Sequence, residues 1–371
     1  MQKKQVAVID VGSSKITAVV GERGINKTFI IKGSYSYEYD GYEDGVFFDV
    51  NKLKKVLFAA GEDLRTASRG AIDTVYVGVP GDFTQVVVKE SQISFSKKKK
   101  IVDEDVDALF EAAFVLASTK YTLINRSAIV YELDDFRRLA NPVGAVSEIL
   151  KGKLSFVVCS NYFIEVVKPS LVTAGFSNVE CVSSALSEAL YLVEPETRDR
   201  IAVLADVGYI STTVSIVHGD GIVYQKSFPY GGGYITAAIV EKFSMEFDHA
   251  EKLKRKVNLS RKVQSSAFDL LECDNGEYYG VEEVQNVVFK SLDILCENIS
   301  DALESSGFVI PEYVPLMVTG GGIAYLRGAK EHVSSRLGMS VQIVAPKVPL
   351  MDKPTESNVL SLLDLALEQN Q

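Results

Sequence analysis

Two short segments of this chain each place an aspartate, and a glycine two residues after it, at the end of an apolar run. The pairs are Asp10 with Gly12 and Asp206 with Gly208. A glycine lets the backbone approach phosphate oxygens closely and aim N–H donors at them. An aspartate does not attract phosphate, but it holds Mg²⁺, usually through water, and the ion neutralises the phosphates. These residue types predict a phosphate-binding site, with Asp10 and Asp206 as the metal-binding residues.

The two segments are copies of one another. Aligned without gaps, residues 6–20 match residues 202–216, an offset of 196 positions. The aligned pairs are Asp10 with Asp206, Gly12 with Gly208 and Thr17 with Thr213. Apolar residues flank both copies with the two-residue period of β-strands. A repeated strand–turn–strand unit predicts a duplicated architecture with the ligand held in the cleft between the two halves.

Other residues near these turns add donors and close backbone approach. Hydroxyl and ammonium donors are expected from Ser13, Ser14, Lys15, Thr212 and Thr213. A glycine triplet, Gly320, Gly321 and Gly322, follows an apolar strand and is expected to approach a nucleotide near its adenine and α-phosphate. A tight strand-to-helix turn explains the same triplet equally well. Gly232, in a second triplet before a helix, is included in the candidate site.

Composition limits the function classes. The chain has 371 residues, enough for two domains or more, and a net charge of −10 argues against a nucleic-acid binder. Its four cysteines form no C-x-x-C pair, and its three histidines are far apart in sequence, so no zinc, redox or histidine-based metal site is expected. Only four apolar residues precede Asp10, which indicates no signal peptide, and no apolar run is long enough to cross a membrane.

The pattern of elements predicts the domain organisation. Residues 1–79 and 161–194 are expected to form a first domain, 80–160 a small α/β subdomain inserted into it, and 195–371 a second domain with 226–310 as its outer part. The basic run Lys97–Lys100 is expected to be a solvated loop, and a helix is expected to follow the Gly320–Gly322 triplet directly.

Together these segments resemble the actin, sugar-kinase and Hsp70 superfamily. Asp10–Lys15 looks like its first phosphate loop, Asp206–Thr213 like its second, and Thr319–Gly322 like its adenosine motif. Helices at 185–193 and 358–367 stand where that superfamily has its two connecting helices. The resemblance implies Mg²⁺ and ATP as ligands. It also implies nucleoside contacts from Glu251 and Lys254, in a segment similar to the Ala-Glu-x-x-Lys of relatives.

Within the superfamily, the chain resembles the bacterial cell-division FtsA family over its whole length. Asn141–Gly144 is similar to a segment of that family's inserted subdomain, Val75–Gly81 is similar to the strand that enters it, and the position of the insert agrees. The implied fold is α/β: an actin-like pair of duplicated RNase H-like domains with an FtsA-type insert. A PilM-like pilus-assembly platform and a small-molecule kinase are the alternatives.

The resemblance also implies partners and location. An FtsA-like protein polymerises into filaments, binds the C-terminal tail peptide of the tubulin-like protein FtsZ, and meets other division proteins. The peptide is expected around residues 226–310, aided by the basic cluster Lys252, Lys254, Arg255 and Lys256. The family is cytoplasmic and peripheral on the inner face of the cell membrane at the division site. Its usual membrane-binding tail is absent from this chain, which ends at Gln371. No nucleic-acid partner is expected.

Departures from the superfamily pattern predict slow hydrolysis at most. Bulky Tyr209 and Ile210 follow Gly208 in the second loop. Ser183 stands near the point where chaperone relatives place a carboxylate that positions water, and Glu188, about a turn and a half further on, is expected to face elsewhere. Because hydrolysis needs a positioned water, no catalytic residue is assigned.

Overall fold

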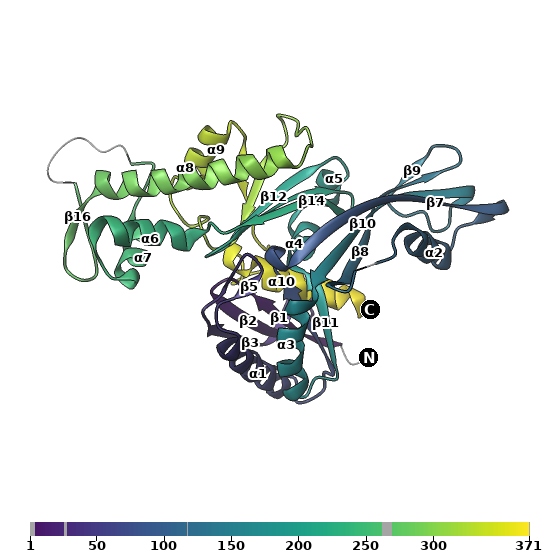
Figure 1. The fold of residues 1–371 in the computed structure, drawn as a ribbon, viewed down its shortest axis with the longest axis horizontal. Helices are drawn as coiled ribbons and strands as arrows, with labels where there is room; N and C mark the ends of the chain where they lie inside the picture. The colour runs from purple at the N-terminus through teal and green to yellow at the C-terminus, as the bar shows by residue number, and fades with distance from the viewer. Residues whose placement is uncertain (1–3, 26–27, 117, 262–268, 371) are drawn as a thin grey trace.

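The computed structural model describes residues 4–25, 28–116, 118–261 and 269–370. Two five-stranded sheets form the centre of the molecule, and a third sheet extends away from them (Figure 1). The first sheet has the order β11–β6–β1–β2–β3. Its strands are β1 (Gln5–Val11), β2 (Lys15–Arg23), β3 (Phe29–Glu38), β6 (Thr74–Val79) and β11 (Asn178–Ser183).

The second sheet repeats the topology of the first. Its order is β14–β13–β12–β17–β18. The strands are β12 (Ala202–Val207), β13 (Thr212–His218), β14 (Gly221–Phe228), β17 (Leu316–Thr319) and β18 (Val341–Ile343). Each sheet joins a three-stranded antiparallel meander to two parallel strands. Asp10 pairs with Thr17, and Asp206 pairs with Thr213, so the sequence repeat is also a repeat of strand register.

Helices cover both faces of each central sheet, as expected for sheets with parallel strands. One face of the first sheet packs against α1 (Val50–Ala67) and α3 (Asn161–Thr173). One face of the second packs against α6 (Gly232–Phe243), α7 (Phe247–Lys256), α8 (Val281–Ser305) and α9 (Ala329–Leu337). Along β1, alternate residues serve the two faces: Ala7 and Ile9 contact the α1–α3 side, and Val6 and Val8 contact the other side.

The remaining face of each sheet is covered by a helix from the other half of the chain. Helix α4 (Ser184–Leu192) follows the first sheet but packs on the second, through Ala189. Helix α10 (Ser357–Gln369) follows the second sheet but packs on the first, through Leu360 and Leu363. The two helices also contact one another. This exchange holds the two halves together and places both helices beside the ends of β1 and β12.

The inserted residues form a sheet with its own apolar core. Its order is β7–β10–β8–β9. The elements are β7 (Thr84–Lys100), α2 (Asp103–Ala113), β8 (Tyr121–Leu133), β9 (Arg138–Leu139) and β10 (Val146–Ser160). Leu109 and Phe110 of α2 pack on Leu150, Leu154 and Phe156 of the sheet. In Figure 1 this sheet projects sideways from the centre of the molecule.

Short elements complete the described chain. They are β4 (Tyr42–Glu43), β5 (Val46–Phe47), η2 (Gly81–Phe83), α5 (Pro195–Arg198), β15 (Leu270–Glu272), β16 (Tyr278–Gly280) and η3 (Pro354–Glu356). No helix within the described ranges is both long and apolar enough to cross a membrane.

Two local expectations from the sequence are wrong. Lys97–Lys100 is not a loop but the end of β7, paired with β10 at Lys99 and Lys100. Alternate side chains of an edge strand can point into solvent, so a basic run does not exclude a strand there. The helix expected directly after Gly322 begins only at Ala329, because turns occupy the residues between them. The proposed domain boundaries stay predictions, and part of the outer region, residues 262–268, lies outside the described residues.

Candidate functional site

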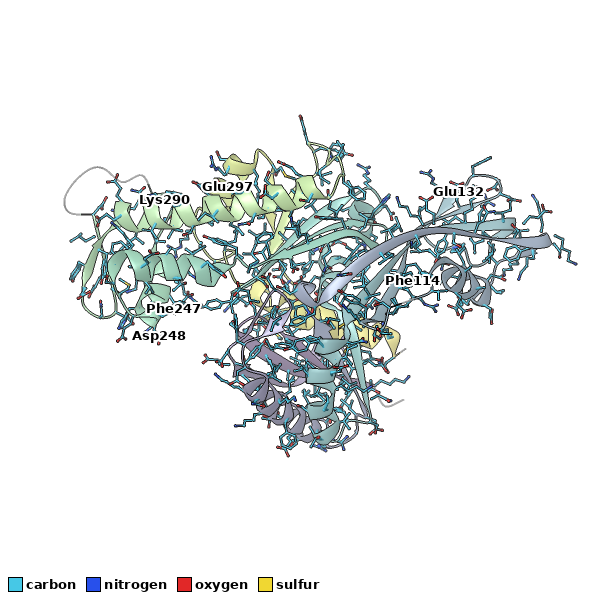
Figure 2. The ribbon with its side chains drawn as sticks, viewed as in Figure 1. Phe114, Glu132, Phe247, Asp248, Lys290 and Glu297 are labelled. Atoms are coloured by element: carbon cyan, nitrogen blue, oxygen red, sulfur yellow. The ribbon has the colours of Figure 1, made fainter. Side chains whose placement is uncertain are left out.

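A cavity of about 550 Å³ lies where the two central sheets meet. The turns after β1 and β12 form two of its walls, and α4, α7, α10 and the Gly320–Gly321 turn form the others. A volume of this size is within the usual range for small-molecule sites. Phe247 and Asp248, labelled in Figure 2, stand where α7 begins and also line the cavity.

Most of the residues expected from the sequence line this cavity. They are Asp10, Gly12, Ser13, Ser14, Lys15, Asp206, Gly208, Thr213, Glu251, Gly320 and Gly321. These residues belong to elements that are remote in sequence. The elements meet because α4 and α10, which pack against each other, each cover one face of a central sheet. The structure therefore brings both copies of the repeated hairpin to one cavity.

Four of the expected residues lie behind the cavity wall. Thr212 is fully buried and donates its hydroxyl to the Tyr230 carbonyl oxygen, at 2.6 Å. Gly232 and Gly322 pack backbone to backbone: a Cβ at Gly232 would lie 2.6 Å from the Gly322 carbonyl oxygen. Lys254 is also fully buried, with Nζ 2.8 Å from the Gly232 carbonyl oxygen. These residues shape the wall rather than face the cavity.

Lys254 instead positions Glu251. Its Nζ lies 2.7 Å from Glu251 Oε2, and Thr236 donates to the same carboxylate. The neighbouring Arg255 also pairs with Glu251, and Tyr325 donates to it. Although burial alone would raise it, Lys254 and the other donors lower the pKa of Glu251 to about 2. Glu251 is thus a fixed anion on the wall, and Arg255 is a further lining residue that the sequence analysis did not include.

The two hairpin turns have the same backbone geometry. A Cβ on Gly12 would lie 2.9 Å from the Lys15 carbonyl oxygen, and a Cβ on Gly208 would lie 2.8 Å from the Ser211 carbonyl oxygen. The turns also bond to each other, because Ser13 Oγ accepts from the backbone N–H groups of Tyr209 and Ile210, at 3.2 and 3.0 Å. The Ser13 hydroxyl therefore links the turn after β1 to the turn after β12.

Glu188 corrects the sequence analysis. It was expected to face away, but it is 1% exposed and lines the cavity on the same helix as Ser184 and Ala185. Residues 184 and 188 are four apart and therefore share a helix face. Ser183, by contrast, is not a lining residue: its hydroxyl caps α4 by accepting from the Leu186 N–H. One feature of the sequence could have indicated that Glu188 is buried in a site. It is the single charged residue in a helix whose other residues are small, uncharged polar or apolar.

The acidic groups of the cavity are poorly compensated. Burial, and then the charge of Asp206, raise the pKa of Asp10 to about 7, while Lys15 opposes the rise. Burial raises the pKa of Asp206, against a hydrogen bond from Asn358. Burial, followed by the charges of Asp206 and Asp10, raises the pKa of Glu188 well above its usual range. Three acids in one site favour either bound protons or a bound cation.

Unpaired polar atoms gather in the same cavity. Nine buried side-chain polar atoms of the described residues have no hydrogen-bond partner, and four of these line the cavity. The four are Ser184 Oγ, Glu188 Oε1, Asp206 Oδ1 and Asn358 Oδ1. Buried polar groups in native proteins almost always have partners, so this set indicates a site built for a polar ligand. Oxygen donors of this kind suit Mg²⁺ with its water shell.

The duplicated sheets and the exchanged helices around a central cavity form an actin-like fold. Solved structures agree on the fold. The PilM–PilN type IV pilus biogenesis complex matches with a TM-score of 0.66 at 17% identity, covering 98% of this chain and 99% of the other. MreB5 of Spiroplasma citri bound to AMPPNP matches with a TM-score of 0.56 at 12% identity, covering 100% and 98%.

Sequence comparison is more specific. The family model described as cell division protein FtsA matches residues 203–361. The cell division protein FtsA of Enterococcus faecalis is 23% identical over 98% of this chain and 83% of its own length, and that of Enterococcus hirae is 21% identical over 96% and 81%. The chain is thus similar to FtsA proteins over nearly its whole length, at low identity, which confirms the resemblance to that family.

Proposed function

We propose that this protein is an actin-like cell-division protein that binds Mg-ATP in the cavity between its two central sheets. The observation that carries the proposal is the group of four unpaired buried polar atoms, which line a cavity formed by two matching glycine turns. The Gly12 and Gly208 turns would meet the phosphates, Glu251 and the Gly320–Gly321 turn the nucleoside, and Asp10 and Asp206 the hydrated Mg²⁺. The nucleotide-bound MreB5 supports the choice of ligand.

Calorimetry with Mg-ATP on the full chain tests the binding site. Binding is expected for the intact protein and for Lys242→Ala, an exposed change on α6 outside the cavity. Asp206→Ala is expected to lose it. The absence of heat with the intact protein, or equal affinity in Asp206→Ala, would remove the central claim.

Slow hydrolysis fits the chemistry of Glu188. When bound, ATP supplies the phosphoryl group and Mg²⁺ neutralises its charge. The protein must then hold a water and accept its proton. Glu188 is a buried acid of the cavity. Burial, and then the charges of Asp206 and Asp10, raise its pKa, which favours the protonated form, and a protonated carboxyl cannot accept that proton. Phosphate release by the intact protein and by Glu188→Gln is therefore expected to be similarly slow. Turnover near the roughly 1–100 s⁻¹ of kinases, lost in Glu188→Gln, would contradict this and favour an enzyme.

We also propose self-association into filaments, with contacts from the inserted sheet. Phe136 at the β8–β9 turn is 77% exposed, and Val146 at the start of β10 is 53% exposed, which leaves apolar surface near the end of the insert. Sedimentation with Mg-ATP should show less assembly for Phe136→Asp than for the matched Phe136→Leu. Equal pelleting of both variants would place the contacts elsewhere.

The FtsZ tail peptide is the proposed partner, but the expected basic cluster does not form one free surface. Lys254 is buried, Lys252 pairs with Asp274, and Arg255 pairs with Glu251. Lys256 is exposed, and its Nζ donates to the Glu272 carbonyl oxygen rather than to a carboxylate. The affinity for the peptide after charge reversal at Lys256 therefore tests the one member of the cluster that is exposed and has no ion pair with a described residue. We also propose that the protein contacts other division proteins and lies at the inner face of the cell membrane. Binding of an FtsZ tail peptide to the purified protein is the first of these partnerships to test. A peptide from a PilN-like protein bound in preference would favour a pilus platform.

A further inference from the structure

A histidine, a cysteine and an aspartate meet at the outer end of the second half, away from the central cavity. His249 belongs to α7, while Cys273 and Asp274 begin the tight turn between β15 and β16. The turn is closed by a bond from the Cys273 N–H to the Glu277 carbonyl oxygen, at 2.8 Å. One potential ligand atom from each of the three residues lies within 4.8 Å of the others. Figure 1 shows α7 and β16 together at one end of the molecule.

The three atoms already form a compact triangle. His249 Nδ1 lies 2.6 Å from Asp274 Oδ1, and Cys273 Sγ lies 3.5 Å from the same oxygen. Around a tetrahedral Zn²⁺, with bonds of about 2.0–2.3 Å, neighbouring ligand atoms are roughly 3.3–3.7 Å apart. The His249–Asp274 contact has to widen, by less than about 1 Å, and the His249 side chain is partly exposed. The His249–Cys273 pair lies within 4.8 Å.

The atoms that do not face the triangle have their own partners. His249 Nε2 lies 3.9 Å from Glu246 Oε2. The second oxygen of Asp274, Oδ2, accepts from Lys252 Nζ. Metal-bound histidines usually donate their other N–H to a carboxylate, and metal-bound carboxylates are usually hydrogen-bonded as well. Lys252 carries a positive charge that opposes a cation, but its side chain is 57% exposed and contacts the oxygen that points away from the triangle.

We propose that His249, Cys273 and Asp274 bind one Zn²⁺ ion, with a water in the fourth position. A thiolate, an imidazole and a carboxylate are the ligands that Zn²⁺ takes, whereas Mg²⁺ and Ca²⁺ take oxygen ligands. Binding removes the thiol proton of Cys273 and uses the lone pair of neutral His249. No such site is expected from the sequence, because its four cysteines form no C-x-x-C pair and its three histidines are far apart.

The ion would fix the β15–β16 hairpin to α7. On another face of the same helix, Glu251 and Arg255 line the central cavity. The proposed zinc site nevertheless shares no residue with the proposed nucleotide site, so the two proposals can be tested independently. A metal bound here stabilises the native state, since the three ligands are brought together only by folding.

The test titrates Co²⁺, a spectroscopic substitute for Zn²⁺, into the full untagged chain after treatment with a chelator. One equivalent is expected to give a thiolate-to-cobalt charge-transfer band, and Zn²⁺ but not excess Mg²⁺ should abolish it. Cys273→Ser should lose the band, and His249→Gln and Asp274→Asn should weaken affinity at least about 10-fold, the lower end of the loss seen even for outer partners. His332→Gln, a histidine paired with Asp293 elsewhere, is the matched control.

Circular dichroism of Cys273→Ser separates loss of the ligand from loss of the fold. A folded variant without the band supports the site. No band in the intact protein, or a band that persists in folded Cys273→Ser, overturns the proposal. If Cys273→Ser does not fold, the decision passes to His249→Gln, whose side chain is at the surface: an unchanged cobalt affinity there overturns the proposal as well. Mg-ATP binding measured on the same samples should be retained.

Discussion

The turn that follows Asp10 and the turn that follows Asp206 have the same backbone geometry and different side chains. In both, a glycine Cβ would collide with the carbonyl oxygen three residues on. The first turn carries two serines and a lysine, whereas the second carries Tyr209, Ile210 and Ser211. The backbone of the repeat is therefore equivalent on both sides of the cavity, while the side-chain hydroxyl and ammonium donors lie mainly on the first side.

The two aspartates also differ in their surroundings. Asp206 Oδ2 accepts from Asn358 Nδ2 at 3.0 Å, and Asn358 comes from the helix that closes the chain. The main favourable influence on the charged form of Asp10 is Lys15. A duplicated scaffold thus presents one carboxylate held in place by a neutral amide and another whose charge depends on a nearby cation. This arrangement suggests that both aspartates take part in binding a ligand with several phosphates and one metal ion, but that their roles are unequal.

The largest expected effect is on Mg-ATP affinity. Asp206→Ala should lower it roughly 30- to 5,000-fold, since removing one partner of a buried charged contact costs about 2–5 kcal/mol. Asp10→Ala is expected to cost less, because it leaves in place the carboxylate of Asp206, which Asn358 holds by a hydrogen bond. Calorimetry of both variants beside Lys242→Ala measures the difference. Equal losses would show that the two sides of the cavity are equivalent.

The second effect is on stability as a function of pH. Because the pKa of Asp10 rises to about 7 in the folded protein, the native state binds its proton more tightly than the unfolded chain. The stability from this group is present at low pH and is lost as the pH rises from about 4 through 7. The loss should be on the order of 2 kcal/mol, since the neighbouring acids share the titration.

Denaturant unfolding at several pH values, with Asp10→Asn as the comparison, isolates this group. The difference in unfolding free energy between the two proteins should change in favour of Asp10→Asn as the pH rises. Saturating Mg²⁺ should reduce the change if the ion binds here. A difference that does not vary between about pH 5 and 8 would show that Asp10 keeps its usual pKa.

The third effect separates two neighbouring glycines. Gly320 has a φ of 86°, and a Cβ there would lie 2.3 Å from Asp206 Oδ1. Gly320→Ala should therefore destabilise the fold by about 1–3 kcal/mol. Gly321 has no such φ, and its Cβ would meet only the Thr355 methyl group, at 3.0 Å. Gly321→Ala should cost less in thermal unfolding, and the reverse order would contradict the assigned geometry.

Much of the fold was predictable because the repeat carries its own register. With Asp10 aligned on Asp206, the two hairpins have the same pairing, with Asp10 opposite Thr17 and Asp206 opposite Thr213. That both faces of β1 and β12 are buried follows only from the helices packed on each side. The position of Glu188 was not predictable in the same way. A lone glutamate on an apolar helix usually turns outward, and only the crossing of α4 beneath the second sheet places it in the cavity.

The expected site residues that lie behind the cavity wall do so for a common reason. Lys254 and Thr212 have side chains suited to ligand contact, yet both satisfy backbone carbonyl groups inside the wall. Sequence gives the residue type and the element but not the rotation of that element against its neighbours. His249 and Cys273 show the opposite case, since no local spacing predicts that α7 and the β15–β16 turn lie side by side.

The smallest effect concerns the hydroxyl that joins the two turns. Ser13 Oγ accepts from two backbone N–H groups of the other half, so Ser13→Ala leaves both donors without this partner. A lost hydrogen bond typically costs about 0.5–1.5 kcal/mol, and about 1 kcal/mol is expected here because water reaches part of the cavity. Ser34→Ala, at an exposed serine of β3 that does not line the cavity, is the matched control.

Ligand should change the size of this loss. If a phosphate oxygen takes the N–H groups of Tyr209 and Ile210, the serine hydroxyl is no longer their acceptor, and the penalty of Ser13→Ala should shrink in saturating Mg-ATP. Thermal unfolding of Ser13→Ala and Ser34→Ala with and without nucleotide measures both quantities. A Ser13→Ala penalty that stays constant with nucleotide would mean that the second turn does not contact the phosphates. The two turns would then differ in their backbone contacts to the ligand as well as in their side chains.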